Sequence, residues 1–205
     1  MTETGTPETP PGQPGTSWQA PAAAAPVPGT AGFVYADVPN RIIALIIDGI
    51  ILAVISFIIT AVLYGIVGQP VEFSVSSTSI ATSVNYVSVL LGAILSLVVG
   101  AVYWIYSWTS MRASPGQKML GMQVGNSPDG QTLTQEQAIR RWAVLFAPFS
   151  LSQVVYVVPT LGALLGLLTF LYAIYLLYTT AQSPTKQGFH DTFANTMVVK
   201  ASRSV

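Results

Sequence analysis

The fold of this chain is decided by the stretch NRIIALIIDG, residues 40–49, because it places two charges in an otherwise apolar region. Residues 42–67 carry no charge except Asp48, and they exceed the about 20 apolar residues that a membrane helix needs. In such a helix Arg41 and Asp48 are two turns apart, roughly 10 Å along the axis and on nearly the same face. A carboxylate inside a span costs about 2.5–3.5 kcal/mol to insert, so we expect Asp48 to face a partner or a water-filled cavity.

The composition of the whole chain also indicates a membrane protein. Hydrophobic residues make up 51% of it and charged residues only 8%, against about 25% charged in a typical soluble domain. The net charge is zero, so bulk charge gives no reason to expect a nucleic-acid partner. There are no cysteines, which excludes disulfides, zinc–thiolate sites and cysteine nucleophiles within this sequence.

Residues 1–35 read as a disordered cytoplasmic tail rich in Pro, Gly and Ala. They contain seven prolines and no periodic apolar face, so they offer little to offset the entropy of ordering. They also lack the basic start and short apolar run of a cleaved signal peptide. The alternative is that the tail binds a cytoplasmic protein as a polyproline ligand.

The first two expected spans cover residues 42–67 and 84–108. Pro39 predicts that the first helix begins at or after it, with Asn40 as the N-cap. In the second span small residues recur at four-residue spacing, which is typical of close helix packing. The aromatic residues at its far end are expected to form an interfacial belt rather than a ligand site. The small residues are Gly92, Ser96 and Gly100, and the aromatic ones are Tyr103, Trp104, Tyr106 and Trp108.

Residues 109–141 are the polar part of the domain. We expect a short cytoplasmic β-hairpin there, with residues 119–124 as its first strand, a turn at residues 126–130 and a return strand at 131–133. Thr134 and Gln137 fit a capping box that opens the next helix, which carries Arg140 and Arg141. Lys118 either contacts an anionic ligand or lipid, or simply faces solvent or headgroups.

Residues 142–181 contain no charged residue, and one straight helix of that length would be about 60 Å long, twice the hydrocarbon thickness. We therefore expect two further spans, residues 142–158 and 161–181, with a break near Pro159. Gly162 and Gly166 form a GxxxG packing face in the second. The alternative is a single kinked crossing, giving three spans.

Charge placement favours four spans with both termini cytoplasmic. All eight basic residues then lie on one side of the membrane, as the positive-inside rule requires. With three spans the last three would lie outside. The eight are Arg41, Arg112, Lys118, Arg140, Arg141, Lys186, Lys200 and Arg203. The expected fold class is an all-α integral membrane protein, a small helical bundle.

The segment after the last span holds the chain's single histidine, His190, next to Asp191. One histidine and one aspartate are too few for a metal site, and no nucleophile-elbow pattern supports a hydrolase. We expect the pair to satisfy backbone groups or basic residues at the membrane face. The topology makes possible a cluster of Arg41, Asp191 and either Arg140 or Arg141, with Asp48 just below it.

The sequence resembles the RDD family of membrane proteins, which is named after one arginine and two aspartates. The resemblance implies a transmembrane domain over residues 36–200, followed by a tail at 201–205, and the proline-rich leader resembles those of actinobacterial members. The family's biochemical role is largely unassigned, with transport of an unknown ligand suggested. The resemblance rests on Arg41 with Asp48, on residues 114–124, on Thr134, Gln137, Ala138 and Arg140, and on residues 188–191 with 194–199, which supply Asp191 as the second aspartate.

Two function hypotheses follow. In the first, the protein transports or exchanges a small ligand or ion by way of Asp48, with Arg41, His190 and Asp191 on the pathway and Lys118, Arg140 and Arg141 in support. In the second, Arg41, Asp48 and Asp191 form a polar clamp in a structural or accessory membrane protein. We predict no enzyme, because the sequence shows no phosphate loop, metal-ligand cluster or nucleophile triad. Expected partners are the lipid bilayer and further copies of the chain; no cofactor and no nucleic acid are expected.

Overall fold

The structure is a computed structural model that describes residues 33–155 and 159–201. The predicted tails at 1–35 and 201–205 lie almost wholly outside these residues. The described part is mostly helical, with six helices and five strands. The four long helices are α1 (Val38–Val67), α2 (Tyr86–Ser110), α4 (Gln135–Val155) and α5 (Pro159–Gln182), and the two short ones are α3 (Pro115–Met119) and α6 (Phe189–Phe193).

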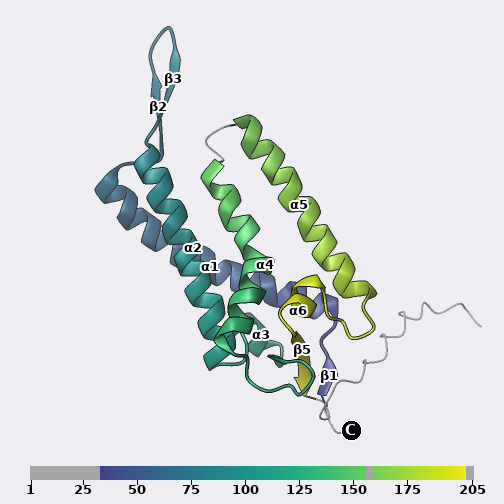
Figure 1. The fold of residues 1–205 in the computed structure, drawn as a ribbon. Coiled ribbons are helices and arrows are strands. Elements are labelled where there is room, and N and C mark those ends of the chain that lie inside the picture. Colours follow the sequence, from purple (N-terminus) through teal and green to yellow (C-terminus); the bar gives the residue numbers. More distant parts are fainter. Residues whose placement is uncertain (1–32, 156–158, 202–205) are drawn as a thin grey trace, which may run out of the picture.

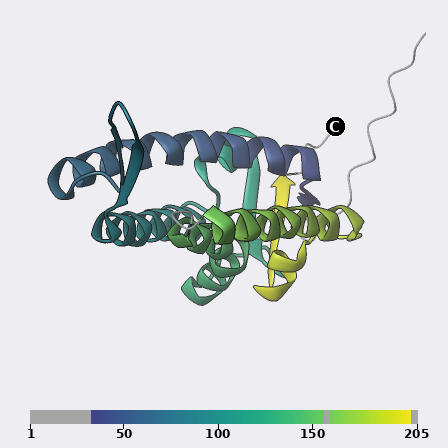
Figure 2. The ribbon, with the colours of Figure 1, turned by 90° about the horizontal axis from the view of Figure 1, so that it is seen from above.

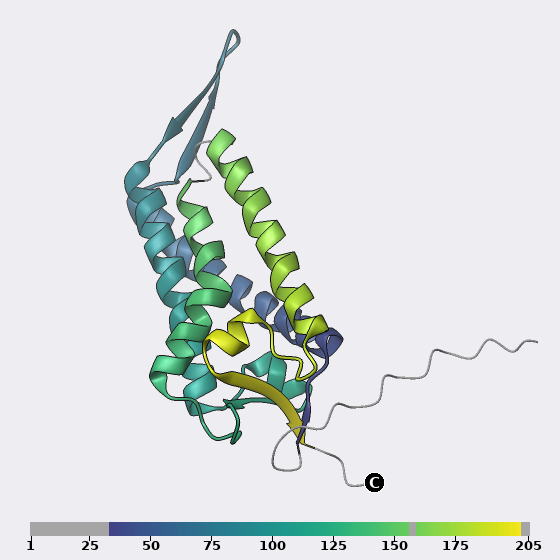
Figure 3. The same ribbon diagram turned by 45° about the vertical axis from the view of Figure 1, so that its right-hand side comes forward.

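The long helices form two layers. Seen from above, α1 lies along one side of the molecule and α2, α4 and α5 lie along the other (Figure 2). The α1–α2 connection, the last described turn of α4 and the first turn of α5 are at one end of the bundle, whereas the strands β1 and β5 and the helix α6 lie at the opposite end (Figure 1). We call these the hairpin end and the sheet end. The same two ends can be recognised when the molecule is turned about the vertical axis (Figure 3).

Three of the long helices are long and apolar enough to cross a membrane, namely α1, α2 and α5. Within its described residues α4 does not reach that standard. It opens with charged residues and contains Pro148. The described part of α4 ends at Val155 and α5 begins at Pro159, so the predicted break near Pro159 falls on residues 156–158, which lie outside the described residues. The structure thus supports three of the four predicted spans by length and composition, and the fourth stays a prediction.

The start of α1 differs from the prediction. The helix begins at Val38, its N-cap is Asp37, and Pro39 lies within its first turn. The N-cap prediction for Asn40 was therefore wrong. Proline is tolerated there because the first N–H groups of a helix have no partner within it.

Two small sheets frame the bundle. At the hairpin end β2 (Val71–Val75) and β3 (Ile80–Val84) form an antiparallel hairpin between α1 and α2. At the sheet end β1 (Phe33–Tyr35), β4 (Met122–Asn126) and β5 (Thr196–Ala201) form a sheet in the order β1-β5-β4.

The hairpin predicted between residues 119–124 and 131–133 was wrong. The strand β4 pairs with β5, from Met122 opposite Lys200 to Asn126 opposite Thr196, and not with residues 131–133. The reason is burial: Met197, Val198 and Val199 on β5 are each only 1% exposed, so this long-range strand brings more apolar surface than the local one. The turn after β4 is present, with Asn126 donating to the carboxylate of Asp129 at 2.8 Å.

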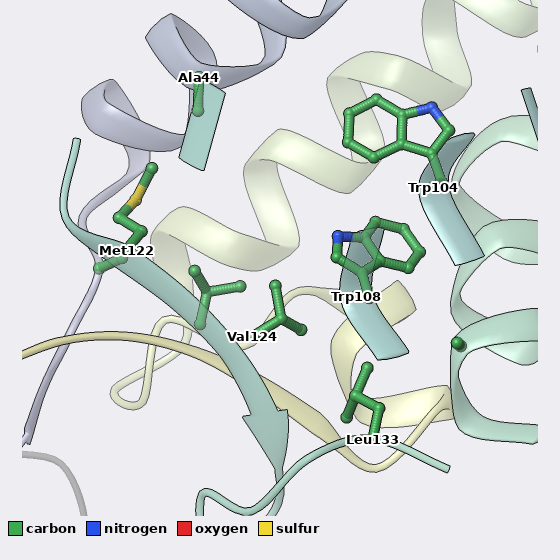
Figure 4. Close-up of a cluster of buried hydrophobic side chains, with 9 residues drawn as sticks. Ala44, Trp104, Trp108, Met122, Val124 and Leu133 are labelled. Carbon is green, nitrogen blue, oxygen red and sulfur yellow. The ribbon is translucent and has the colours of Figure 1, made fainter. Parts of the chain in front are cut away.

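The buried core lies at the sheet end, between α1, α2 and β4. Trp104 and Trp108 point into it from α2, and Met122 and Val124 face them from β4 (Figure 4). Trp104 also stacks on Phe146 of α4, with 4.4 Å between ring centroids. The belt prediction was therefore wrong for Trp104 and Trp108, which pack inside the protein.

Candidate functional site

The carboxylate of Asp191 lies at the sheet end, fully buried between two arginines. Arg41 Nη1 on α1 donates to Asp191 Oδ2 at 2.6 Å, and Arg141 Nη1 on α4 donates to Asp191 Oδ1. Arg141 Nη1 also donates to Thr196 Oγ1 at 2.6 Å. We call Arg41, Arg141 and Asp191 the ion triad. It joins α1, α4 and α6, which are far apart in the sequence.

Local structure holds Asp191 in place at the third position of α6. Its Oδ2 accepts the backbone N–H of Gly188, the N-cap residue, at 3.2 Å. A side chain at Gly188 would collide with Thr180 Oγ1 of α5, so only glycine allows α6 to pack this closely against α5. Burial alone would raise the pKa of the Asp191 carboxyl, but Arg141, His190 and Arg41 outweigh it and hold that pKa well below its ordinary value.

Each arginine of the triad makes further contacts. Arg41 Nε donates to the Ala36 carbonyl at 3.1 Å, and its Nη2 reaches the Val198 carbonyl at 3.5 Å, so α1 is also tied to the sheet. The guanidinium carbon of Arg141 lies 5.0 Å from the ring centroid of Trp108, within the range of a cation–π contact. The Nε atom of Arg141 is buried and has no hydrogen-bond partner among the described residues.

His190 borders the triad and is itself buried. Its Nε2 lies 3.5 Å from Asp191 Oδ2, and its buried Nδ1 has no hydrogen-bond partner among the described residues. Burial lowers the pKa of His190 to about 4, the attraction of Asp191 being offset in part by Arg141 and Arg41. The imidazole is therefore neutral near pH 7, and the triad with its histidine carries one net positive charge.

Asp48 is also fully buried, but it does not pair with Arg41. Its carboxylate accepts hydrogen bonds from Tyr103 Oη of α2 at 2.7 Å, from the backbone N–H of Gly116 at 2.8 Å, and from Ser114 Oγ. Ser114 is the N-cap of α3 and Gly116 lies in its first turn, so Asp48 holds this short helix against α1. A side chain at Gly116 would collide with the Ala44 carbonyl oxygen, which makes glycine necessary here.

The structure thus brings Arg41, Arg141, His190 and Asp191 into one cluster and leaves Asp48 in a second one. Arg140 is outside both, because it pairs with Glu136 on an exposed face of α4. Lys118 is exposed. Sequence reasoning missed the donors to Asp48 on α2 and α3; the serine and proline that open α3 were a signal for a capped helix, but nothing in the spacing linked it to Asp48.

The predicted packing residues have different surroundings. A Cβ at Gly92 would collide with Tyr64 Oη of α1, so α1 and α2 approach closely there. A Cβ at Gly100 or Gly166 would meet no atom within 4 Å. Ser96 and Gly162 are half-buried.

A cavity of about 470 Å³ connects the two clusters. Its polar wall includes Arg41, Asp48, Arg141 and His190, and the rest of its lining is mainly apolar side chains of α1, α4 and α5. This volume falls within the ~300–1,000 Å³ typical of small-molecule sites. No group of three His, Cys, Asp or Glu side chains that would hold a metal occurs within residues 33–155 and 159–201.

The comparisons with known proteins place the chain in a family. No curated protein and no solved structure gives a significant match. The profile of the RDD family matches residues 35–195, a stretch that begins just before α1 and ends between α6 and β5 and that includes Arg41, Asp48 and Asp191. Because the match covers well over half of the sequence, the chain belongs to the RDD family, a family of membrane proteins.

Proposed function

We propose that this protein is a membrane transporter that carries a small ligand or ion through the cavity between α1, α4 and α5. The observation that carries the proposal is the position of Asp48: a fully buried carboxylate on an apolar helix, in the wall of a cavity that Arg41 and Arg141 of the ion triad also line. Ionisable groups within membrane helices are costly and mark ligand or ion pathways in other proteins.

Asp48 has a specific part in the proposed mechanism. Its three donors come from α2 and from the α3 region, so a proton or cation at this carboxylate competes with Tyr103, Ser114 and Gly116 for its oxygens. Binding there weakens the hold of α1 on α3. In this way occupancy of Asp48 is coupled to the position of a loop that borders the cavity, with no covalent chemistry and no cofactor.

The charge distribution supports a cytoplasmic sheet end. Within the described residues the basic side chains belong to segments at or near the sheet end. The charged residue described at the hairpin end is the acidic Glu72. The positive-inside rule then puts both described ends of the chain in the cytoplasm of a cell-membrane protein, with α4 as a fourth span. Since so few helices enclose a narrow pathway, we also propose that copies of the chain assemble in the bilayer.

Flux measurements test this function. The protein is reconstituted in vesicles and the uptake of protons and of sodium is followed for the wild type, Asp48→Asn and Tyr106→Phe. We expect flux above that of empty vesicles in the wild type and in Tyr106→Phe, which changes an exposed tyrosine, and loss of flux in Asp48→Asn. Asp48→Glu keeps a carboxylate and is expected to retain part of the flux. Flux at the level of empty vesicles in all four proteins would overturn the proposal.

A second candidate is a structural or accessory role, and the ion triad favours it. Arg41, Arg141 and Asp191 tie together α1, α4 and α6, three helices that are far apart in the sequence. Under this alternative the triad and Asp48 act as a polar clamp that fixes helix packing. Substitution in the triad would then lower stability, while the wild-type protein would show no flux of its own.

A further inference from the structure

The cavity opens sideways between α1 and α5. Ile42 and Leu45 of α1 and Leu177 of α5 line it, yet these side chains are 36%, 44% and 44% exposed. They therefore form part of the cavity wall and of the outer surface at once. Because α1 and α5 are both apolar enough to cross a membrane, this opening faces the hydrocarbon chains of the lipid.

The inner end of the cavity is positively charged and contains a donor without a partner. Arg141 lines the cavity, is 2% exposed, and its Nε–H, covered by the surrounding atoms, has no partner among the described residues. His190, also in the lining, leaves its Nδ1 without a partner in the same way. Two guanidinium groups against the single carboxylate of Asp191 leave one positive charge there. An acceptor with a negative charge would balance this excess charge.

We propose that the cavity binds an anionic amphiphile, a molecule with one apolar chain and a carboxylate or phosphate head, which enters sideways from the bilayer. The head lies against the guanidinium group of Arg141, and the chain lies along the apolar walls of α4 and α5 near Phe149, Ala173 and Leu177. The inference rests on the proposed transport function, in which the amphiphile is the carried ligand and the proton or cation at Asp48 is the coupled ion.

The negative charge of Asp48 does not prevent this placement. Asp48 lies two helical turns from Arg41, roughly 10 Å along α1, and its oxygens are occupied by three donors. The anionic head therefore meets the net positive triad, and the carboxylate of Asp48 stays in its own hydrogen-bonded cluster. A cationic head would instead face the two arginines without any free acceptor on Asp191.

Fluorescence quenching tests the proposal on the full chain. Trp104 and Trp108 both line the cavity, so a brominated chain bound inside it quenches their fluorescence on contact. The protein is placed in nanodiscs of phosphatidylcholine and titrated with four brominated amphiphiles of equal chain length: a carboxylate, a phosphate, an alcohol and a trimethylammonium. We expect saturable quenching by an anion, and only the linear quenching of bilayer partition by the alcohol and the cation. Saturable quenching by the carboxylate alone indicates a fatty acid as the ligand, and saturable quenching by the phosphate alone indicates a lipid phosphate.

Three variants locate the binding site. Ala173→Phe fills the cavity from α5 and is expected to abolish saturable quenching, whereas its control Leu171→Phe alters an exposed residue of α5 that does not line the cavity. Arg141→Lys keeps the charge of the triad but removes the guanidinium group, and should weaken binding by about tenfold. Equal quenching by all four amphiphiles, or unchanged quenching in Ala173→Phe when that variant unfolds at the wild-type temperature, would overturn the inference. Because binding is measured without flux, its failure is distinguishable from failure of the transport proposal.

Discussion

Arg41 and Asp191 are 150 positions apart in the sequence and form an ion pair of 2.6 Å at the sheet end of the bundle. The carboxylate is fully buried and the arginine side chain is 12% exposed. Arg141 approaches the other carboxylate oxygen from α4. The ion pair thus links the N-terminal and C-terminal parts of the domain. The pairing of β1 with β5 is a second link between the same two parts.

We predict that Asp191→Asn lowers the free energy of unfolding by about 3–5 kcal/mol, because it leaves two buried guanidinium groups without their counter-charge. A double-mutant cycle with Arg41→Gln should show that the two losses are not additive. The measurement is unfolding of the single and double variants in detergent. Additive losses would contradict a direct pairing of Arg41 with Asp191.

The matched control is the pair Glu136 and Arg140 on α4, which also joins a carboxylate to an arginine. Its side chains are 71% and 51% exposed, so solvent screens the attraction. We expect the same cycle on Glu136→Gln and Arg140→Gln to give a coupling below about 0.5 kcal/mol. A coupling as large as that of the buried pair would mean that burial is not what makes the triad strong.

Stability should fall as the pH is lowered from about 6.5 to about 4, and His190 is the reason. The pKa of His190 is about 4 in the folded protein against an ordinary 6.5, mainly because of burial. Between these values the unfolded chain binds a proton that the folded chain does not, so acidification favours unfolding. The full effect is on the order of 3 kcal/mol, and it is complete near pH 4. The groups facing His190 are Asp191, Arg141 and Arg41, and the pKa of Asp191 is held below 3.8, so it adds its own loss only at lower pH.

This prediction is easy to isolate because the chain has a single histidine. Melting temperatures of the wild type and of His190→Gln are compared from pH 7.5 to pH 4. We expect a fall in the wild type and a nearly flat profile in the variant over the same range. Parallel profiles would show that the pKa of His190 is the same in the folded and the unfolded state.

Much of the ion triad was predictable from the sequence, whereas the environment of Asp48 was not. Arg41, Asp191 and a basic residue near position 140 stood out because charges are rare, and topology placed them at one end of the bundle. The choice of Arg141 over Arg140 depends on which face of α4 is buried, and only the packing shows that. The partners of Asp48 are a backbone N–H, a serine and a tyrosine, residue types that are common in this chain and carry no charge to draw attention.

The errors in the fold have a related cause. The local pattern after α2 predicts a hairpin, but β4 pairs with β5 about 70 residues later, because the buried side chains of β5 are long-range partners that no local window contains. Trp104 and Trp108 stand at the end of a membrane helix, where belt aromatics also occur. Their spacing of four residues puts both on one face, and that face happens to be the one covered by α4 and β4.

Tyr103→Phe should lower the free energy of unfolding by about 1.5–3 kcal/mol, because Tyr103 Oη donates to the buried carboxylate of Asp48 at 2.7 Å. The neighbouring Tyr106→Phe removes the same hydroxyl from a side chain that is 60% exposed and should change stability by less than about 0.5 kcal/mol. Unfolding of both variants in the same detergent checks the difference. Equal values would mean that the hydroxyl of Tyr103 finds an equally good partner in the unfolded state.

Gly116→Ala should loosen α3 from α1. The new Cβ would collide with the backbone oxygen of Ala44 and crowd the carboxylate of Asp48, neither of which can move without shifting α1. We expect a loss of about 1–3 kcal/mol from this overpacking. The control is Gly49→Ala, next to Asp48 on α1, where an added Cβ meets no atom within 4 Å and helix propensity improves by up to about 1 kcal/mol.

The chain's lack of cysteine provides a direct readout of this loosening. Ala113 lies just before α3 and is 1% exposed, so Ala113→Cys introduces a single buried thiol. A maleimide should label it slowly in the otherwise wild-type protein and in Gly49→Ala, and several-fold faster in Gly116→Ala. Labelling at one rate in all three backgrounds would mean that the contact between α3 and Asp48 tolerates a side chain at position 116, and that Asp48 is not what holds this loop in place.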